Sequence, residues 1–371
     1  MDAMTAAGII RQFAIYGEFI GAVSFGGGHI NDTFCSEWNQ AGTVVRYTHQ
    51  RINRRVFACP DKVMENIVRV TDHIAEKLMS AGECGWNRRS LTVVPARDGK
   101  PWARDSEGGW WRTYLFIENA HSLEKTSSAA DARFLGAGIG RFQKQLADLP
   151  APRLHDTIPH FHDMEKRYTG FYDALKKDSC GRAREAASEI DFMRSNEERG
   201  GILVRAQREG RIPELICHND AKINNILIDD GTSNALCVID LDTVMPGTVL
   251  FDAGDLIRTV TSTAAEDERD LSKVEFNLAF FEALLEGYFS EALEFLSGEE
   301  INLIAESGRN ITQIMALRFL TDFLEGDHYY HTSRPGHNLD RCRNQIALIQ
   351  SMDSRWEEAL KIVRKLGSHK P

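Results

Sequence analysis

The chain has 371 residues and a formal net charge of −10 at pH 7, from 54 acidic and 44 basic side chains. A chain of this length is too long for one small hydrophobic core, which favours about two or three packed structural units. The acidic balance gives no general electrostatic reason to bind nucleic acid or an anionic membrane surface, so we expect neither partner. Its seven cysteines never occur as CxxC, which indicates neither a disulfide framework nor a thiolate zinc site.

No stretch reaches the ~18 consecutive apolar residues that span a bilayer. The N-terminus also lacks a basic start followed by a long apolar core, which is the pattern of a secretory signal. We therefore expect a cytoplasmic protein.

The first third of the chain is predicted to be rich in strands. VSFGGGHINDTF at 23–34 places three glycines between two short strand-like pieces, and VVRYTHQRI at 44–52 has the composition of another strand. Apolar residues at helical spacing over 61–82 predict one amphipathic helix. Residues 91–119 then contain apolar runs separated by the turn signals DGK and EGG. These elements predict a β-sheet with one helix.

From about residue 128 the patterns become helical, and strand-like runs return only at 215–242. We therefore predict an N-terminal unit at 1–118 and a helical C-terminal unit at 119–371. The segment ICHNDAKINNILID at 216–229 is unusual because a polar loop interrupts two apolar strand-like runs. Polar side chains on a loop between rigid elements are typical of catalytic groups.

The polar loop carries residue types that suit phosphoryl transfer. Asp220 and Asn225 lie five positions apart, and Asp240 ends the following strand-like run. Asn225 and Asp240 offer oxygen ligands of the kind that Mg²⁺ prefers, with nucleotide phosphates and water completing its shell. Asp220 is positioned to accept the proton of an attacking hydroxyl, and Lys222 to offset charge on the transferred group.

These residues resemble a known family. HNDAKINN is similar to the H-x-D-x-K-x-x-N catalytic loop of the protein-kinase-like superfamily, and IDLDT to its metal-binding segment. With FDAGDLIR at 251–258, the chain resembles the aminoglycoside phosphotransferase branch, and GGGHINDTF, QRIN and VIDLDTVMPGTVLFDAGDLIR resemble the N-acetylhexosamine 1-kinases. The resemblance implies an α+β bilobal kinase-like fold, with a small β-rich lobe and a larger helical lobe.

The resemblance also implies roles for individual residues. Asp220 matches the catalytic base, and Asn225 and Asp240 match the magnesium ligands. The expected contacts to ATP come from Gly26, Gly27 and Gly28 in the phosphate loop, from a hinge at Glu118 to Ala120, and from Arg51. In kinases a cation on the third strand, here called the strand cation, contacts the α- and β-phosphates of ATP. Arg51 is expected at this position, and Arg46 on the same strand is the alternative. Glu65 is the expected ion-pair partner of this cation, with Glu76 as fallback.

The acceptor implied by the resemblance is a sugar, phosphorylated at its anomeric hydroxyl. The candidate sugar contacts are Arg318, Tyr329, His29 and Asp32. Each also has an ordinary structural interpretation; a salt bridge within a helix would explain Arg318. Asp252 and Asp255 are interpreted as structural, with Asp255 bracing the catalytic loop and capping the helix behind it.

Two alternatives stay open. Relatives of this fold act on other small acceptors, namely choline, homoserine, methylthioribose and aminoglycosides. A cationic acceptor requires a cage of acids and aromatic rings, whereas the C-terminal segment offers Arg318, Arg334 and several histidines. A nucleotide-binding pseudokinase without catalysis is the second alternative, and the complete set of Asp220, Lys222, Asn225 and Asp240 argues against it.

Overall fold

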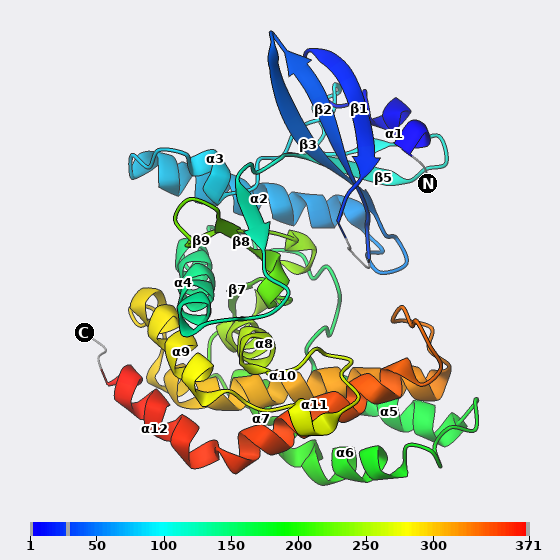
Figure 1. The fold of residues 1–371 in the computed structure, drawn as a ribbon, viewed down its shortest axis with the longest axis vertical. Coiled ribbons are helices and arrows are strands. Elements are labelled where there is room, and N and C mark those ends of the chain that lie inside the picture. The colour runs from blue at the N-terminus through cyan, green and yellow to red at the C-terminus, as the bar shows by residue number, and fades with distance from the viewer. Residues whose placement is uncertain (1–2, 27–29, 369–371) are drawn as a thin grey trace.

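The N-terminal part of the protein is a five-stranded antiparallel sheet (Figure 1). The structure is a computed structural model that describes residues 3–26 and 30–368. The strand order is β1-β2-β3-β5-β4. The bounds are β1 (Glu18–Ser24), β2 (Asp32–Gln40), β3 (Thr43–Ile52), β4 (Ala103–Arg104) and β5 (Trp110–Leu115). The Gly-rich segment connects β1 to β2.

The two faces of this sheet pack against different partners because successive side chains of a strand point to opposite faces. Tyr47 and Trp111 belong to a small core on the side of α1 (Ala3–Ile10). Ile52 and Tyr114 belong instead to the main core, which continues through α2 (Pro60–Ser80) into the helical region. Odd-numbered positions of β3 therefore face α1, and even-numbered positions face the rest of the molecule.

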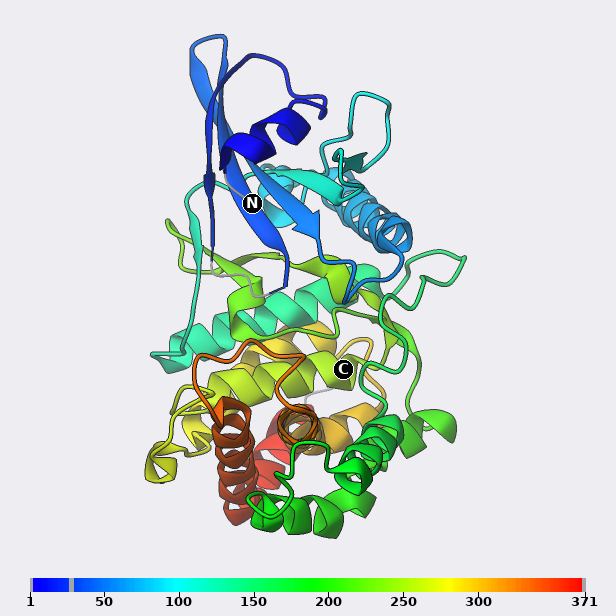
Figure 2. The same ribbon diagram turned by 90° about the vertical axis from the view of Figure 1, so that its right-hand side faces the viewer.

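The remaining chain is mainly helical and lies below the sheet in both ribbon views (Figures 1 and 2). The short α3 (Trp86–Arg89) precedes β4 in the chain. The helices of the C-terminal region are α4 (Ala129–Leu146), α5 (Met164–Lys177), α6 (Ala187–Gly200), α7 (Ile202–Arg208), α8 (Val249–Thr261), α9 (Leu278–Ala292), α10 (Gly298–Glu325), α11 (His337–Ser354) and α12 (Trp356–Gly367).

Short strands frame the polar loop found in the sequence. β6 (Ala120–Ser122), β8 (Ile226–Asp229) and β9 (Ala235–Val238) form one small sheet, while β7 (Leu215–Cys217) pairs with β10 (Met245–Gly247). Between them lie the 3₁₀ turns η1 (Ile223–Asn225) and η2 (Leu241–Thr243), with η3 (Leu271–Lys273) further on. The loop from residue 218 to 225 is thus held at both ends by paired strands.

Helix α8 supports this loop from behind and is itself fixed to α10. A side chain at Gly254 would meet the backbone oxygen of Ser307 at 2.4 Å, and one at Gly308 would meet Ile257 at 2.4 Å. Only glycine permits the two helices to approach this closely. The polar loop consequently rests on two packed helices.

The predicted α+β fold is confirmed, with a β-rich N-terminal region and a helical C-terminal region. One local expectation is wrong: residues 91–95 make no named strand, and Val93 contributes only an isolated bridge to Tyr114. The division between 118 and 119 stays a prediction. Over the described residues, no helix is long and apolar enough to cross a membrane.

Candidate active site

The backbone of the catalytic loop is fixed by buried side chains. His218 is fully buried and donates from Nε2 to the carbonyl of Ile239 at 2.8 Å. The carboxylate of Asp252 on α8 accepts from the backbone N–H groups of His218 at 3.0 Å and Asn219 at 2.7 Å. His218 therefore lies in the scaffold, and Asp252 braces the loop.

The role expected for Asp255 is wrong in both parts. Asp255 forms an ion pair with Arg258, with Oδ1 at 2.8 Å from the guanidinium. The N-cap of α8 is Thr248, whose side chain accepts from the N–H of Leu250. Sequence alone does not distinguish Asp252 from Asp255, because residues three apart share one face of a helix and their position along the axis decides which one reaches the loop.

Asp220 and Lys222 project from the loop side by side, with 3.1 Å between carboxylate and ammonium. Burial alone would raise the pKa of Asp220, but the charge of Lys222 and its hydrogen bond to the carboxylate contribute to lowering the pKa to about 2. The charge of Asp220 in turn raises the pKa of Lys222. Asp220 is therefore an ionised carboxylate beside a fixed positive charge, as the predicted role of proton acceptor requires.

Asn225 and Asp240 offer oxygens that no other described residue uses. The Asn225 amide nitrogen donates to the backbone carbonyl of Asp220 at 2.8 Å, which leaves its amide oxygen free. The carboxylate of Asp240 makes no hydrogen bond or ion pair within the described chain, and the backbone of this residue is left-handed, with φ of 62°. Burial and the charge of Asp242 raise the pKa of Asp240 to about 6. An amide oxygen and a carboxylate without a hydrogen-bond partner form a donor set that fits Mg²⁺.

Asp242 belongs to a buried network that joins this segment to the N-terminal sheet. It pairs with Arg112 of β5, and both side chains are buried, with 4% and 0% of their surface exposed. Asn31, just before β2, donates its amide to the other carboxylate oxygen of Asp242 at 2.6 Å. Arg112 also donates to the amide oxygen of Gln50 at 2.7 and 2.9 Å. Asp242 thus braces the sheet against the segment that carries Asp240.

The ion pair expected between Arg51 and Glu65 is wrong. Arg51 is an odd-numbered residue of β3, so its side chain lies on the α1 side and pairs with Asp105 at 3.4 Å and Glu107 at 3.2 Å. Glu65 of α2 pairs instead with His155 at 2.9 Å. The cleft-facing position next to Arg51 is Gln50, and the buried cation near it is Arg112.

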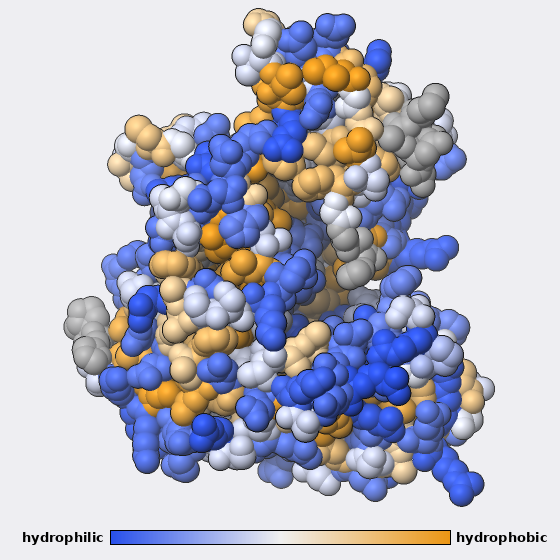
Figure 3. Space-filling view, viewed as in Figure 1, coloured by the Kyte–Doolittle hydropathy of each residue, from blue (hydrophilic) through white to orange (hydrophobic). Residues whose placement is uncertain are grey.

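The expected hinge lies where β5 leads into β6, and the surface is hollowed between the sheet and the helices (Figure 3). Arg46 of β3 pairs with Glu118 and lies over the ring of Phe116 at 4.0 Å. Arg88 of α3 donates to the backbone carbonyls of Glu118 at 2.8 Å and Asn119 at 3.1 Å. Arg46, the alternative strand cation, therefore lies at the hinge.

The Gly-rich segment is described only in part. Gly26 has φ of 77°, a conformation that favours glycine, and the preceding Phe25 contacts Phe116 of the hinge with ring centroids 5.5 Å apart. Gly27, Gly28 and His29 lie outside the described residues. Asp32 is exposed at the start of β2 and makes no side-chain contact in the described chain.

Arg318 and Tyr329 lie together on the helical side of the site. Arg318 of α10 reaches the hydroxyl of Tyr329 at 3.4 Å, and its guanidinium is 5.1 Å from the ring of Phe161. The neighbouring His162 is buried and donates from Nε2 to the carbonyl of Asn219 at 2.7 Å, one residue before Asp220. The segment HFHD at 160–163 therefore connects the two candidate acceptor residues to the catalytic loop.

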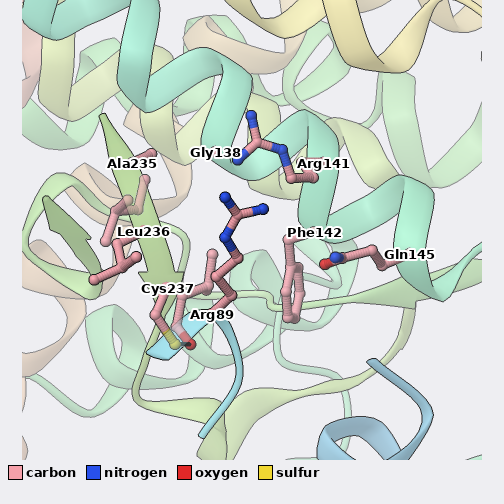
Figure 4. A pocket seen from close by; sticks show the side chains of 10 residues that line it. Arg89, Gly138, Arg141, Phe142, Gln145, Ala235, Leu236 and Cys237 are labelled. Carbon is pink, nitrogen blue, oxygen red and sulfur yellow. Dashed lines mark hydrogen bonds between the residues drawn. The ribbon is translucent and has the colours of Figure 1, made fainter. Parts of the chain in front are cut away.

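A separate small cavity of about 20 Å³ lies behind the hinge, between α3, α4 and β9 (Figure 4). The guanidinium groups of Arg89 and Arg141 point toward each other across it. Both are already paired with acids, Arg89 with Glu83 and Arg141 with Glu291. None of the predicted site residues lines this cavity.

Sequence reasoning missed Arg112, Asn31 and His162. Arg112 lies within WWRTYL, a run that indicates a strand but does not show that its arginine is buried. Asn31 sits between two residues that were considered as sugar contacts. His162 lies in HFHD, where two histidines stand close together, but its partner is the backbone of a loop 57 residues away.

The comparisons with known proteins agree with this geometry. A sequence model of the Phosphotransferase enzyme family matches residues 24–294. Among solved structures, choline kinase from Cryptosporidium parvum Iowa II has a TM-score of 0.60 and 11% identity, over 99% of each chain. Spectinomycin phosphotransferase in complex with ADP and spectinomycin has a TM-score of 0.58 and 10% identity, over 99% of this chain and 98% of that one. At these identities the structures show a shared fold.

The fold and the loop from His218 to Asp240 define a kinase-like phosphotransferase. The chain belongs to the Phosphotransferase enzyme family, whose sequence model covers most of its length. As a member, it is an enzyme that transfers a phosphoryl group to a hydroxyl acceptor.

Proposed function

We propose that this enzyme transfers the γ-phosphoryl group of ATP to the anomeric hydroxyl of an N-acetylhexosamine, giving the sugar 1-phosphate. The observation that carries the proposal is the convergence of Asp220, Lys222, Asn225 and Asp240 in one loop system below the sheet. The resemblance of GGGHINDTF, QRIN and HNDAKINN to the N-acetylhexosamine 1-kinases supports the choice of acceptor.

Each residue of the loop has a defined part in this proposal. Asp220 accepts the proton of the attacking hydroxyl, which is somewhat acidic at an anomeric position, so a modest base is sufficient. Lys222 stabilises the negative charge of the phosphoryl group during transfer. Asn225 and Asp240 hold Mg²⁺, which supplies charge neutralisation of the nucleotide phosphates when bound.

Nucleotide binding is proposed for the hollow between the sheet and the helices. The adenine would lie against the backbone of the hinge near Glu118, and Gly26 begins the loop over the phosphates. Arg112 is the buried cation on this face of the sheet, whereas Arg51 lies on the opposite face. This geometry supports Arg112, acting through Asp242, more than Arg51 as the cation that organises the phosphate region.

The second candidate is the same chemistry on another small acceptor. Three cations, Lys166, Arg167 and Arg318, line a cavity on the acceptor side. Two acids also line this cavity, Asp322 and Glu325, but the carboxylate of Asp322 already accepts from backbone N–H groups. The excess of positive charge therefore disfavours a choline or an aminoglycoside there.

The test is ADP release with Mg·ATP across N-acetylglucosamine, N-acetylgalactosamine, their parent sugars, choline and homoserine. The Asp220→Asn variant, prepared in parallel, reports any contaminating kinase. Phosphorus NMR of the product then gives the phosphorylated position. An anomeric phosphate on an N-acetylhexosamine supports the proposal. Turnover with choline or homoserine alone would support kinase activity and exclude the sugar as the acceptor. Nucleotide binding without any turnover would favour the pseudokinase.

A further inference from the structure

A cavity of about 160 Å³ opens between α5, α10 and the segment that follows α10. Its charged lining residues are Lys166, Arg167, Arg318, Asp322 and Glu325, and Tyr329 and Tyr330 supply aromatic surface. Cations therefore outnumber acids in its wall. Which of these charges are already neutralised by protein partners decides what the cavity can bind.

Arg318 is held by aromatic rings and has almost no polar partner. Its guanidinium lies 5.1 Å from the ring of Phe161, 5.5 Å from Tyr329 and 5.4 Å from Tyr330. Its polar contacts are a sulfur at 3.6 Å and the Tyr329 hydroxyl at 3.4 Å. A guanidinium has five N–H donors. No carboxylate of the described residues lies within ion-pair distance of Arg318, so most of these donors are available to a ligand.

Arg167 is a second cation without an acidic partner in the described chain. It donates from Nε and one Nη to the backbone carbonyl of Phe161 at 3.1 and 2.6 Å. Burial, followed by the charge of Arg318, lowers the pKa of Arg167 to about 10. Two partly buried guanidinium groups therefore repel each other. A protein leaves such charges uncompensated at a cost in stability, and a bound anion would offset it.

The acids of the cavity do not neutralise these cations. The carboxylate of Asp322 accepts from the backbone N–H groups of Tyr329 and Tyr330 at 2.8 and 3.0 Å, which holds the segment after α10 in place. Glu325 lies seven residues beyond Arg318 on the same helix, which corresponds to about 10 Å along the axis. The carboxylate of Asp322 is thus already bonded to backbone N–H groups, and within the described residues neither acid forms an ion pair with Arg318 or Arg167.

Arg318 is connected to the catalytic loop through Phe161, whose ring it contacts. His162, adjacent to Phe161, donates to the carbonyl of Asn219. Burial lowers the pKa of Arg318, but Tyr330, Tyr329 and Asp220 outweigh this and raise it overall. Asp220 is therefore close enough for its charge to stabilise the charged form of Arg318. A ligand held by Arg318 would place the rest of its structure near the proposed base.

We propose that this cavity binds an anionic group of the acceptor, a carboxylate or a phosphate ester, between Arg318 and Arg167. The proposal rests on the phosphoryl transfer proposed for Asp220 and narrows its acceptor to a sugar that carries an acidic substituent. A guanidinium fork matches two oxygens of a carboxylate or phosphate, and such charge-assisted hydrogen bonds are stronger than those to a neutral hydroxyl. An N-acetylhexosamine with an acidic group at a carbon remote from the anomeric one satisfies both sites.

The binding test uses the full chain with saturating ADP and magnesium, titrated calorimetrically with three ligands. These are N-acetylglucosamine, its uronic acid and its 6-phosphate. We expect at least one acid to bind about tenfold more tightly than the neutral sugar, because one charge-assisted hydrogen bond contributes roughly this factor. The identity of the tighter acid distinguishes a carboxylate from a phosphate ester.

Variants assign the effect to the cavity. Arg318→Gln should remove the advantage of the acid and leave ADP affinity unchanged, and Arg167→Lys, which keeps the charge, should retain part of it. Lys177→Gln, an equal charge change at an exposed residue of α5 outside the cavity lining, should have no effect. Glu325→Gln should strengthen binding of the acid.

The proposal is overturned if the neutral sugar binds as tightly as both acids, or if the advantage of the acid persists in Arg318→Gln. A parallel ADP-release assay separates this outcome from the proposed function. If the acidic sugars bind but are not phosphorylated, the anion site is supported and the proposed phosphoryl transfer at Asp220 is contradicted. If the neutral sugar is phosphorylated efficiently and no acidic sugar is preferred, the phosphoryl transfer is supported and the anion site is contradicted.

Discussion

Arg112 on β5 and Asp242 in η2 form a buried ion pair between two segments 130 residues apart in the chain. The pair is hydrogen-bonded further, since Gln50 accepts from Arg112 and Asn31 donates to Asp242. Asp242 follows the proposed metal ligand Asp240 by two residues. The position of the N-terminal sheet over the metal-binding segment therefore depends on one fully buried guanidinium.

Replacing Arg112 by Gln should destabilise the protein and impair nucleotide binding. Removing one partner of a buried pair leaves an uncompensated charge, which costs about 3–5 kcal/mol. The control is Arg51→Gln on the opposite face of the same sheet, where partly exposed pairs contribute about 0–1 kcal/mol. Thermal unfolding and the KM for ATP measure both effects. Equal shifts in the two variants would show that Arg112 has no special role.

The sequence was sufficient to predict that Asp220, Lys222 and Asn225 lie together, because they are close along the chain. Asp220, Lys222 and Asn225 lie within six positions, so a short loop brings them together in any fold that contains it. The strand cation was harder, because it depends on which face of β3 is inward. A shift of one residue exchanges Gln50 for Arg51, and the sequence pattern of the strand does not settle that choice. Arg112 was missed because its partner is distant in sequence.

Asp220→Asn should lower kcat by about 10²–10⁴-fold with little change in ADP affinity. The change removes the proton acceptor but keeps the side-chain volume. The Asp220→Asn change also removes the ion-pair partner of Lys222. Lys222→Met is therefore measured in parallel, and it should also lower kcat. Steady-state ADP release measures kcat, and calorimetric titration with ADP measures its affinity. Turnover close to the wild type in Asp220→Asn would exclude it as the base.

Asp240→Asn should weaken magnesium-dependent nucleotide binding, because the substitution removes the negative charge from the proposed ligand pair. Asp230→Asn is the matched control, since Asp230 is an exposed carboxylate that pairs with His121. We expect the magnesium concentration for half-maximal turnover to rise at least about tenfold in Asp240→Asn, as loss of one charged ligand implies, and to stay constant in the control. An unchanged magnesium dependence would place the ion elsewhere.

Arg46→Ala should raise the KM for ATP, whereas Arg51→Ala should not. Arg46 lies over Phe116 and pairs with Glu118, so its loss leaves the hinge carboxylate without its partner. Arg51 faces away from this side of the sheet. A steady-state comparison at saturating acceptor decides between them. The reverse result would restore Arg51 as the strand cation.

His49 should make stability fall as the solution is acidified below neutral pH. It is fully buried between the hydroxyls of Ser36 and Thr113, at 2.7 Å from each, and burial lowers its pKa to about 3 from an ordinary value of 6.5. Near pH 5 the unfolded chain therefore binds a proton that the folded protein does not. The stability contributed by neutral His49 is fully present above pH 6.5 and is lost as pH falls toward 3.

The loss attributable to His49 should reach about 2 kcal/mol at pH 5, since each unit of difference in pKa corresponds to about 1.4 kcal/mol. Other buried groups titrate in the same range, so the measurement is the difference between wild type and His49→Gln. The free energy of unfolding should decline less steeply from pH 7 to pH 5 in the variant, even though the variant starts less stable. Parallel curves would mean that His49 accepts its proton equally well in the folded and unfolded states.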